Sequence, residues 1–577
     1  MVKGWTGKRL RIDLNLQRSW SEEIPREDLV LRIGGRGLNS AFFSEEVSSS
    51  ISPSSPEYPI VFAVGPLTGT FAPCSGWTSI SGSSPLVHPP GYFHVSMPGH
   101  WGAQLKFAGF DQCVVQGRSE KPIYLSIDGE KVRFEDARSL WGKDTVETTV
   151  SIQEAMGDRT TEVLCIGPAG EGLLPFANIV NRFSWTADHV GPGYVLGTKN
   201  LKAIAIHGET PVFLEDPKGF LARCSALRDR IHMDRTASRL KESGTFFLLG
   251  TNGGGFGIQN FHESRRPDME ETWGTLYTRK YLYGREGCFS CPIHCGRITQ
   301  VEGNFFGGVH LEGAWSLGPR IGITDWEATL RLYRLCQRQG IDPSAAGSLL
   351  SWVMDSYERG ILSEQELGRT GCRWGDEEAA RKMIDQVILG TGGGEVLRHG
   401  SLRAAQNLGK GLDLVAHSAG MDLPIRDPRS SMEYALSLAL FPAEWDYLSS
   451  MTPIGLSDGS GIAERVAASE ELKVLSDLAC LCPLVVARLG LISPSDIAEM
   501  TSFATGLTED PQEMISVVRK TLQMERALSE RNESGEKKPD LLAVRFFNDP
   551  SSTGSRLDRG PWNKAISDAE NRIAHGA

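Results

Sequence analysis

Three cysteines in a short, glycine-flanked loop carry the clearest chemical signal in this sequence. The segment GCFSCPIHCGR places Cys288, Cys291 and Cys295 in a C-x2-C-x3-C spacing. Thiolates so close together can surround one face of a metal centre, and 4Fe-4S clusters are commonly bound by cysteines at such short spacings. Three ligands leave one iron without a protein ligand, so we expect a fourth cysteine from elsewhere in the chain.

The segment DLACLCPLV offers two candidates for that fourth ligand, Cys480 and Cys482. Cys482 is followed by proline, as Cys291 is, and we predict that it binds the cluster. A ligand from so far along the chain would tie two helical regions together around the cluster. A structural zinc site and a chance clustering of cysteines are the alternative interpretations.

A histidine and a glutamate that follow the cysteine loop are candidates for acid–base chemistry. His310 lies two residues before Glu312 in GGVHLEGAWSLG, and such a pair can hold an acid and a base in one pocket. The alternative is that both are packing or surface residues.

Cys74 and Cys372 lie in no interpretable pattern. The cysteines in apolar patterns, expected to be small core residues, are Cys113, Cys165, Cys224 and Cys336.

Composition limits the class of protein that positions these residues. The 577 residues are 40% apolar and 23% charged, as in globular proteins, which excludes wholesale disorder and fibrous rods. A chain of this length has room for about two to four domains. The net charge of −11 is spread along the chain without a basic stripe, so nucleic acid is not an expected partner.

The start of the chain indicates the compartment. MVKGWTGKRLRIDLNL has basic residues but no apolar segment behind them, so no secretory signal is predicted. No uninterrupted apolar stretch reaches the roughly 18 residues of a membrane span. We therefore expect a cytoplasmic protein whose 11 cysteines stay reduced, which favours metal binding over disulfides.

Residues 1–210 are predicted to form a β-rich domain. Apolar and polar residues alternate over residues 10–16, as in a strand buried on one face. PIYLSIDGEKVRF predicts a hairpin with Asp128 and Gly129 at its turn, because a type I′ turn favours this dipeptide. The runs PIVFAVGPLTG, EVLCIGPAGEG and LKAIAIHG end in glycine or proline and predict further strands.

Helices are indicated by their end signals. Asp144 as N-cap and Glu147 three residues later predict one helix within the β-rich region. In TDWEATLRLYRLCQRQG, Thr324 and Glu327 predict a capping box, and Gly340 predicts the C-terminal end.

Period-3.6 patterns dominate from residue 211 onward. We expect a helical domain over residues 211–410, which carries the cysteine loop, and a second over residues 411–577, which carries Asp477 and Cys482. The predicted fold class is therefore α+β, with a two-layer β domain followed by two mainly helical domains.

Several segments, met in the same order, resemble the tungsten-containing aldehyde ferredoxin oxidoreductase family. They are GWTGKRLRIDL, IGGRGLN, AVGPLTGTFAP, WGAQLKFAGFD, CIGPAGEG and VLGTKNLKAIAIHG, and the cysteine loop follows where the family has its cluster ligands. The resemblance covers most of the chain. It implies a β domain that forms a base for a metal bis-pterin cofactor, helical domains that close over it, and a 4Fe-4S cluster that passes electrons to ferredoxin.

Residues of the metal centres carry over from the resemblance one by one. Cys288, Cys291, Cys295 and Cys482 match the four cluster ligands of the family. Glu312 matches the glutamate beside tungsten, whose proposed role is to activate water or to handle the proton as the aldehyde is attacked.

Two motif segments match the pterin-binding part of the family. Asp477 matches the aspartate of D-x-x-G-L-C, with Cys480 where glycine is usual. The sister motif D-x-x-G-L-D is present as QRQGID, in which Gln337 replaces the first aspartate. The pterin-binding residues that the resemblance predicts are Asp477, Leu481, Gly340, Ile341 and Asp342.

The chain departs from the family at several positions. Trp77 stands where an arginine between cluster and pterin is usual, and Asp188 and His189 replace a glycine-arginine-glycine-glycine turn near the pterin phosphates. An acidic residue there calls for magnesium or a lysine beside the phosphates. The family's second catalytic residue, a histidine, has no counterpart in MEYALSLALFPAEWDYLSS, which leaves His310 or Asp446 to do part of its work.

Two functions follow from these matches and departures. The favoured one is a redox enzyme that oxidises an aldehyde or related oxo compound with water at a tungsten or molybdenum bis-pterin centre, in anaerobic metabolism. The alternative is an electron-transfer or scaffolding subunit that keeps the cluster without a working pterin site. The expected partners are ferredoxin or another iron–sulfur carrier, and the chain would be a homodimer or a complex subunit.

Related tungsten-dependent benzoyl-CoA reductases have a metal-binding cysteine in the region of the active-site glutamate. No cysteine lies between Cys295 and Cys336, which argues against that reaction.

Overall fold

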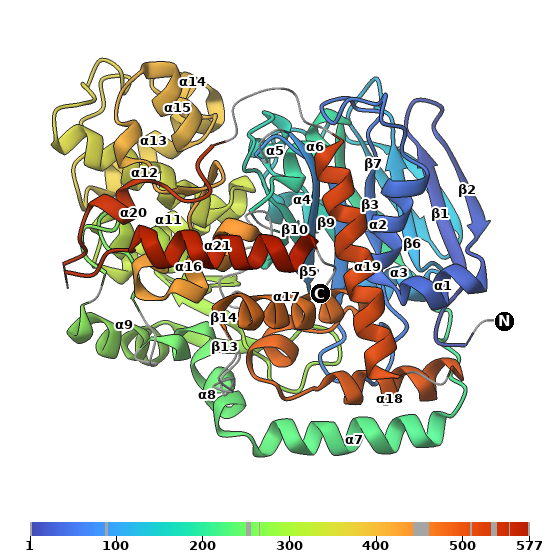
Figure 1. Cartoon of the computed structure of the whole chain (residues 1–577). Helices are drawn as coiled ribbons and strands as arrows, with labels where there is room; N and C mark the ends of the chain where they lie inside the picture. Colours follow the sequence, from blue (N-terminus) through green and yellow to red (C-terminus); the bar gives the residue numbers. More distant parts are fainter. Residues whose placement is uncertain are drawn as a thin grey trace.

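The computed structural model of the chain describes residues 3–86, 90–187, 189–249, 255–264, 266–441, 461–507, 510–531, 539–552 and 554–574. Sheets dominate the chain up to residue 207, and helices dominate the rest (Figure 1). This arrangement confirms the α+β class. Among the described helices, none combines the length and the apolar character that a membrane span requires.

Two six-stranded sheets form the N-terminal part. Their strand orders are β2-β1-β6-β3-β4-β5 and β11-β10-β9-β12-β7-β8, and each contains one parallel pair, β1 with β6 and β7 with β12. Buried side chains of both sheets share one apolar core, so the sheets pack as two layers. The strands are β1 (Lys8–Asp13), β2 (Arg18–Glu23), β3 (Ile60–Ala63), β4 (Trp77–Ser84), β5 (Gly91–Pro98), β6 (Gln112–Gln116), β7 (Ile123–Asp128), β8 (Lys131–Asp136), β9 (Glu162–Cys165), β10 (Ile179–Asn181), β11 (Trp185–Ala187) and β12 (Leu201–His207).

Helices from the N-terminal and the C-terminal parts of the chain together cover these sheets. Helix α2 packs on β3 and β4, and α19, nearly 500 residues later, packs on α2. The C-terminal helices are thus part of the cover of the N-terminal sheet. The helices of the N-terminal part are α1 (Arg26–Arg32), α2 (Gly35–Glu45), α3 (Trp101–Phe107), α4 (Thr145–Met156), α5 (Pro168–Glu171) and α6 (Pro192–Thr198).

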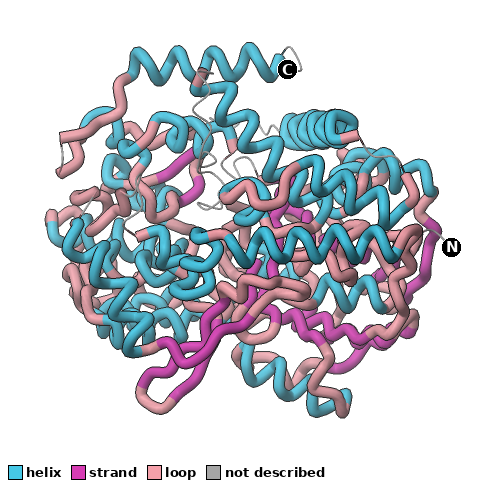
Figure 2. The backbone as a smooth tube through the Cα atoms, turned by 90° about the horizontal axis from the view of Figure 1, so that it is seen from below, coloured by secondary structure: helices cyan, strands magenta, loops and turns pink. Residues whose placement is uncertain are grey.

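After residue 207, the part of the chain that the structure describes is mainly helical and contains two small sheets, β13-β14-β15 and β16-β17. Helix α7, at the bottom of Figure 1, crosses the face that is turned to the viewer in Figure 2. The small-sheet strands are β13 (Leu282–Glu286), β14 (Gly296–Val301), β15 (Asn304–Gly307), β16 (His417–Ser418) and β17 (Met421–Asp422). The helices are α7 (Pro217–Met233), α8 (Arg235–Ser243), α9 (Pro267–Lys280), α10 (Leu311–Ser316), α11 (Trp326–Gln339), α12 (Pro343–Glu358), α13 (Glu377–Leu389), α14 (Gly394–Leu397), α15 (Ser401–Leu408), α16 (Met432–Leu440), α17 (Ile462–Ala479), α18 (Pro494–Thr505), α19 (Pro511–Glu530), α20 (Arg545–Asn548) and α21 (Arg559–Ala574).

Two of the predicted helix ends are confirmed and one is wrong. Asp144 and Glu147 form the predicted capping box of α4, and Gly340 ends α11 in the left-handed region with φ +72°. The N-cap of α11 is Asp325 and not Thr324, because the Asp325 carboxylate accepts the backbone N–H of Ala328 at 2.8 Å.

The predicted hairpin is confirmed with a shifted turn. Asp128 pairs with Lys131, so the two loop residues are Gly129 and Glu130, and only Gly129 has a positive φ, of +57°. The strand predicted over residues 10–16 ends earlier, at Asp13.

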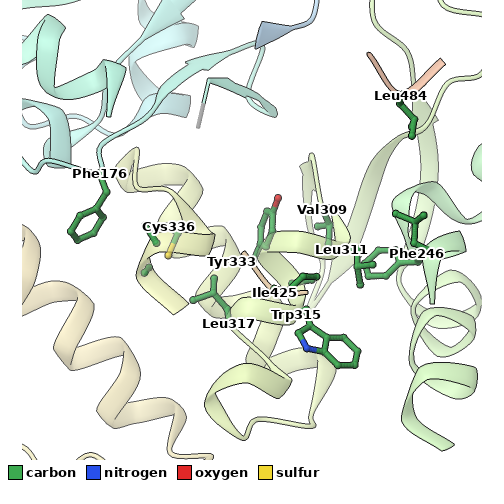
Figure 3. Close-up of a cluster of buried hydrophobic side chains, with 14 of the residues drawn as sticks. Phe176, Phe246, Val309, Leu311, Trp315, Leu317, Tyr333, Cys336, Ile425 and Leu484 are labelled. Carbon is green, nitrogen blue, oxygen red and sulfur yellow. The ribbon is translucent and has the colours of Figure 1, made fainter. Parts of the chain in front are cut away.

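A large apolar cluster frames helix α10, which carries Glu312. Figure 3 shows Leu311, Trp315 and Leu317 within this cluster, together with Phe176 and Leu484 from remote segments. The indole N–H of Trp315 donates to the Gly257 carbonyl at 2.9 Å, which fixes the ring. The short helix is therefore held by packing rather than by its own length.

Candidate active site and metal centre

One cavity collects most of the residues singled out in the sequence. It lies where the strands β4 and β5 meet the cysteine loop, helix α10, the start of α12 and the end of α17. Its empty space is about 1630 Å³, a volume that includes the open mouth. The predicted site residues among its lining are Cys288, Cys291, Cys295, Cys482, His310, Glu312, Ile341, Asp342 and Asp477.

The four predicted cluster cysteines reach this cavity from two segments. Cys288, Cys291 and Cys295 lie in the loop between β13 and β14, and Cys482 follows the end of α17. The loop turns sharply at Ser290, which has a φ of +57°. The structure thus brings together thiols that are almost 200 residues apart in the sequence.

The electrostatics of these thiols favour a bound cation. Burial, reinforced by the neighbouring thiolates, raises the pKa of Cys288 and Cys482 well above the ordinary value. Burial also raises the pKa of Cys295 to about 12, whereas the neighbouring Cys74 side chain lowers the pKa of Cys291 to about 7. Deprotonating all of them together therefore requires positive charge at their centre, which iron would supply.

A structural zinc site is the alternative interpretation of these cysteines. No three His, Cys, Asp or Glu side chains in the described ranges converge closely enough to hold a single metal ion. A zinc ion needs four ligands at about 2.0–2.3 Å, whereas the ligands of an iron–sulfur cube are spread around a larger group. The donor set fits the cluster, and the ligand assignment remains a prediction.

Cys480 does not take part in this donor set. It occupies the C-cap of α17 with a φ of +54°, the left-handed conformation for which glycine is preferred. Its thiol packs 3.8 Å from the Ala63 carbonyl and 3.6 Å from the Asp477 carbonyl, away from the cavity lining. The glycine usual at this position in the family is thus explained by helix termination.

Cys74 is a cavity residue that no sequence pattern identifies. It is buried and lines the cavity beside the four predicted ligands. Its N–H donates to the Ser290 carbonyl at 3.1 Å, and its own carbonyl accepts the N–H of Cys482 at 2.9 Å. A single cysteine after a proline has no spacing pattern, so only the tertiary structure identifies it.

Glu312 presents one unsatisfied oxygen in the cavity. Its Oε1 accepts the N–H of Ile425 at 3.0 Å and the hydroxyl of Ser344 at 3.3 Å. Its Oε2 is buried and has no hydrogen-bond partner within the described residues. A buried acceptor without a partner costs free energy unless a ligand or water satisfies it, so this atom points to a bound group.

Burial shifts the pKa values of the predicted acid–base pair in opposite directions. Burial raises the pKa of Glu312 to about 7, although His189, the Ile425 N–H and Arg320 act against this rise. Burial and then Arg297 lower the pKa of His310 to about 4. At neutral pH the imidazole is therefore uncharged, while Glu312 is poised to gain or lose a proton.

Asp477 is the most strongly paired carboxylate in the cavity. It accepts hydrogen bonds from Arg36 at 3.1 Å, Lys473 at 2.7 Å and Ser96 at 2.8 Å, and the ring of His94 lies 3.5 Å away. Burial alone would raise the pKa of Asp477, but Lys473, His94 and Arg36 bring it well below the ordinary value. The side chain stays ionised and fixed.

The second motif segment is anchored to the N-terminal part. Ile341 forms a β-bridge with Ala177, and the Asp342 N–H donates to the Phe176 carbonyl at 3.1 Å. Burial would raise the pKa of Asp342, but His189 and two backbone N–H groups keep it below the ordinary value. Ile341 and Asp342 face the cavity, whereas Gly340 is not part of its lining.

The remaining predicted residues have mixed outcomes. Leu481 is buried in the core and does not line the cavity. Gln337 and Trp77, which replace family residues, both line it, and the Gln337 amide donates to the Gly307 carbonyl at 2.9 Å. Asp188 and Asp446 lie outside the described residues.

Comparisons with known proteins give one consistent family. The family model "Aldehyde ferredoxin oxidoreductase, N-terminal domain" matches residues 9–208, and "Aldehyde ferredoxin oxidoreductase, domains 2 & 3" matches residues 223–567. Tungsten-containing aldehyde ferredoxin oxidoreductases of Pyrococcus furiosus and Thermococcus kodakarensis are each 30% identical over 573 residues, covering 96% of this chain and 93% of theirs.

Two more distant proteins extend the comparison. The WOR-like subunit of aliphatic sulfonate oxidoreductase from Pyrococcus furiosus is 26% identical over 469 residues, covering 75% of this chain and 73% of its own. The solved active-site complex BamBC of benzoyl coenzyme A reductase with 1,5-dienoyl-CoA superimposes with a TM-score of 0.86 at 20% identity, covering 100% of this chain and 95% of the other. This likeness shows a shared fold.

The placement of the two neighbouring cysteines generates a test of the ligand assignment. Cys482→Ser removes a thiol from the cavity, so we expect the anaerobically purified protein to lose at least about one of four irons per chain and to change the electron paramagnetic resonance signal of the reduced cluster. Cys480→Ser, the matched control, changes a thiol that faces the Ala63 carbonyl and should keep both readouts. The opposite pattern would reverse the assignment.

Proposed function

Because the chain belongs to the aldehyde ferredoxin oxidoreductase family, we propose that it oxidises an aldehyde to a carboxylate, with water as the oxygen source, at a tungsten bis-pterin centre. The chain is an oxidoreductase of the tungsten-pterin type. Each turnover, RCHO + H2O → RCOO− + 3 H+ + 2 e−, releases electrons and protons. The electrons would leave through a 4Fe-4S cluster to ferredoxin or another iron–sulfur carrier.

The observation that carries this proposal is the unpartnered oxygen of Glu312. The rest of that side chain is held by Ile425 and Ser344, so Oε2 is fixed in place in the cavity. A carboxylate with a pKa of about 7 has nearly equal tendencies to accept and to release a proton at neutral pH, which suits a general base. We assign Glu312 the task of taking the proton from the attacking water.

His310 supports this step without carrying charge. It is the N-cap residue of α10, two positions before Glu312, and its ring lies 6.4 Å from that of Trp185. Because the ring is neutral at neutral pH, it can orient water or substrate by a hydrogen bond. We assign it this orienting role in place of the missing family histidine.

The cavity residues fit a bis-pterin group. Asp477 and Asp342 are carboxylates from the two motif segments whose pKa values lie below the ordinary value, and both line the cavity in which a pterin would be held. Lys473, which is paired with Asp477, also lines the cavity, and magnesium would supply the further positive charge that phosphates need. When bound, the tungsten or molybdenum bis-pterin would supply the two-electron acceptor.

The alternative of an electron-transfer or scaffolding subunit is not favoured. The unsatisfied buried oxygen of Glu312 costs free energy in the folded state, and a bound cofactor or substrate would offset this cost. In a site that had lost its cofactor, nothing would offset it. The carboxylates of both motif segments are also still held in fixed geometry, at Asp342 by Ser344 and at Asp477 by Lys473.

Replacing the proposed base tests the mechanism. We expect Glu312→Gln to keep tungsten and iron at wild-type levels but to lower kcat by about 10²- to 10⁴-fold with any aldehyde that the wild type oxidises, because the amide cannot accept the proton. Metal analysis and a viologen-coupled assay measure both quantities. Glu162→Gln is the matched control, since Glu162 is a buried glutamate with a pKa raised by burial that lies outside the cavity lining. Normal turnover in Glu312→Gln would remove this residue from the mechanism.

The raised pKa of Glu312 also sets a pH dependence. The base works only when ionised, so kcat/KM should fall about tenfold per pH unit below pH 7 and level off above it. A pH series from about 5.5 to 8.5 on the loaded enzyme measures this limb. A profile that is flat across pH 7, or one that rises toward acid pH, would contradict the assignment of Glu312 as the base.

A further inference from the structure

A surface groove lies directly outside the cysteine loop. Phe289 and Ser290, the two residues between Cys288 and Cys291, line this groove together with Phe71 and Leu214. The cysteines themselves line the internal cavity. The loop therefore separates the cluster site from solvent by a single layer of residues, and this is where an electron can reach the surface by a short path.

Arg228 on α7 fixes this part of the surface. Its guanidinium donates to the Ser290 hydroxyl at 2.7 Å, the Ser290 carbonyl at 3.1 Å and the Phe71 carbonyl at 3.2 Å. It also stacks over the Phe71 ring, 4.0 Å from the centroid, and this ring is 47% exposed. An exposed aromatic ring on a rigid frame is typical of the centre of a protein–protein interface.

The helices beside the groove carry an excess of positive charge. Residues 217–243 contain seven Lys and Arg against three Asp and Glu, in a chain of net charge −11. Arg223 and Arg230 are neutralised by Asp496. The exposed side chains without an ion pair in the described ranges include Lys218, Arg235 and Arg239.

Helix α8, which carries Arg235 and Arg239, is linked to the cysteine loop. Arg297, at the start of β14, donates to the Leu240 carbonyl at 2.9 Å and to the His294 carbonyl at 3.3 Å. The unpaired charges of α8 therefore lie beside the segment that holds the cluster cysteines. Figure 1 shows α7 along the outside of the molecule, with α8 following it.

We propose that this face, defined by Phe71, Arg228, Phe289 and Ser290 with the basic residues of α8, docks an acidic iron–sulfur electron carrier. The proposal rests on the proposed function, because it needs a cluster behind the loop. Opposite charge steers an acidic carrier to the loop and raises its association rate at low ionic strength, while Phe71 supplies the apolar contact.

Charge reversal on α8 tests the docking face without any aldehyde. The dithionite-reduced protein is mixed in a stopped-flow instrument with an oxidised acidic 4Fe-4S ferredoxin, and then with benzyl viologen as a small carrier. For Arg235→Glu combined with Arg239→Glu we expect ferredoxin reduction to be at least about tenfold slower at low salt, with the difference lost at high salt. Viologen reduction should be unchanged.

The matched control reverses the same number of charges far from the loop. Arg373 and Lys382, just before and within α13, are exposed and have no ion pair in the described part of the chain, so Arg373→Glu with Lys382→Glu should leave both rates unchanged. Equal slowing in both variants, or no slowing in either, would overturn the docking face. A cluster that dithionite cannot reduce in the wild type would instead contradict the proposed function.

Cys74 supports a second, independent inference. Besides its backbone bonds to Ser290 and Cys482, it lines the cavity together with the four predicted ligand cysteines. It holds a φ of +64°, a conformation that is unfavourable for a residue with a Cβ atom. We infer that the Cys74 thiol donates a hydrogen bond to a cluster ligand and thereby raises the reduction potential of the cluster, since such bonds stabilise the more negative reduced state.

The potential, rather than activity, tests this positioning role. Cys74→Ala removes the donor and should shift the midpoint potential of the cluster to a more negative value, in a titration followed by electron paramagnetic resonance, with iron content unchanged. Cys74→Ser keeps a donor and the same backbone strain, so it should restore most of the potential. Iron loss in Cys74→Ala would make Cys74 a ligand instead, and equal potentials in all three proteins would also overturn the inference.

Discussion

The buried ion-pair network around Asp477 is the interaction on which the site depends. Arg36, from the N-terminal helix α2, binds Asp477 and also Glu525 of α19, and all three side chains are buried. Charges removed from water are stable only when they are fully paired, so losing one member would leave the others uncompensated. Residues almost 500 positions apart are thereby held at fixed distances, and the cavity forms where they meet.

The same helix connects the pterin site with the cluster. Asp477 lies in the last turn of α17, and Cys482 follows after the left-handed cap at Cys480, so the carboxylate and the thiol share one rigid segment. The Cys482 N–H is bonded to Cys74, whose own N–H is bonded to the cysteine loop at Ser290. An electron passing between the two centres would therefore cross a short, continuous and well-packed part of the chain.

Sequence patterns predicted what local physics determines and missed what only tertiary structure decides. The capping box of Asp144 and the end at Gly340 depend on neighbouring residues, and both are confirmed. Thr324 and Asp325 are both acceptable N-caps, and the choice depends on where packing begins the helix. The α+β class was predicted from the periodicity of apolar residues, and most site residues were predicted from the family resemblance. Cys74 has no spacing pattern and matches no motif of the resemblance, so neither kind of evidence predicts it.

The two motif segments differ in the charge that they present to the cavity. At this point the chain also departs from the motif pattern expected of its family. In one segment Asp477 is locked by Arg36 and Lys473. In the other, Gln337 offers a neutral amide that is already engaged with the Gly307 carbonyl, and the carboxylate of this segment is Asp342. A carboxylate paired with a pterin amino group gives a stronger, charge-assisted bond than an amide can. Asp477 would therefore give a bound pterin a charge-assisted bond that Gln337 cannot give, so the second segment would depend on Asp342 for such a bond.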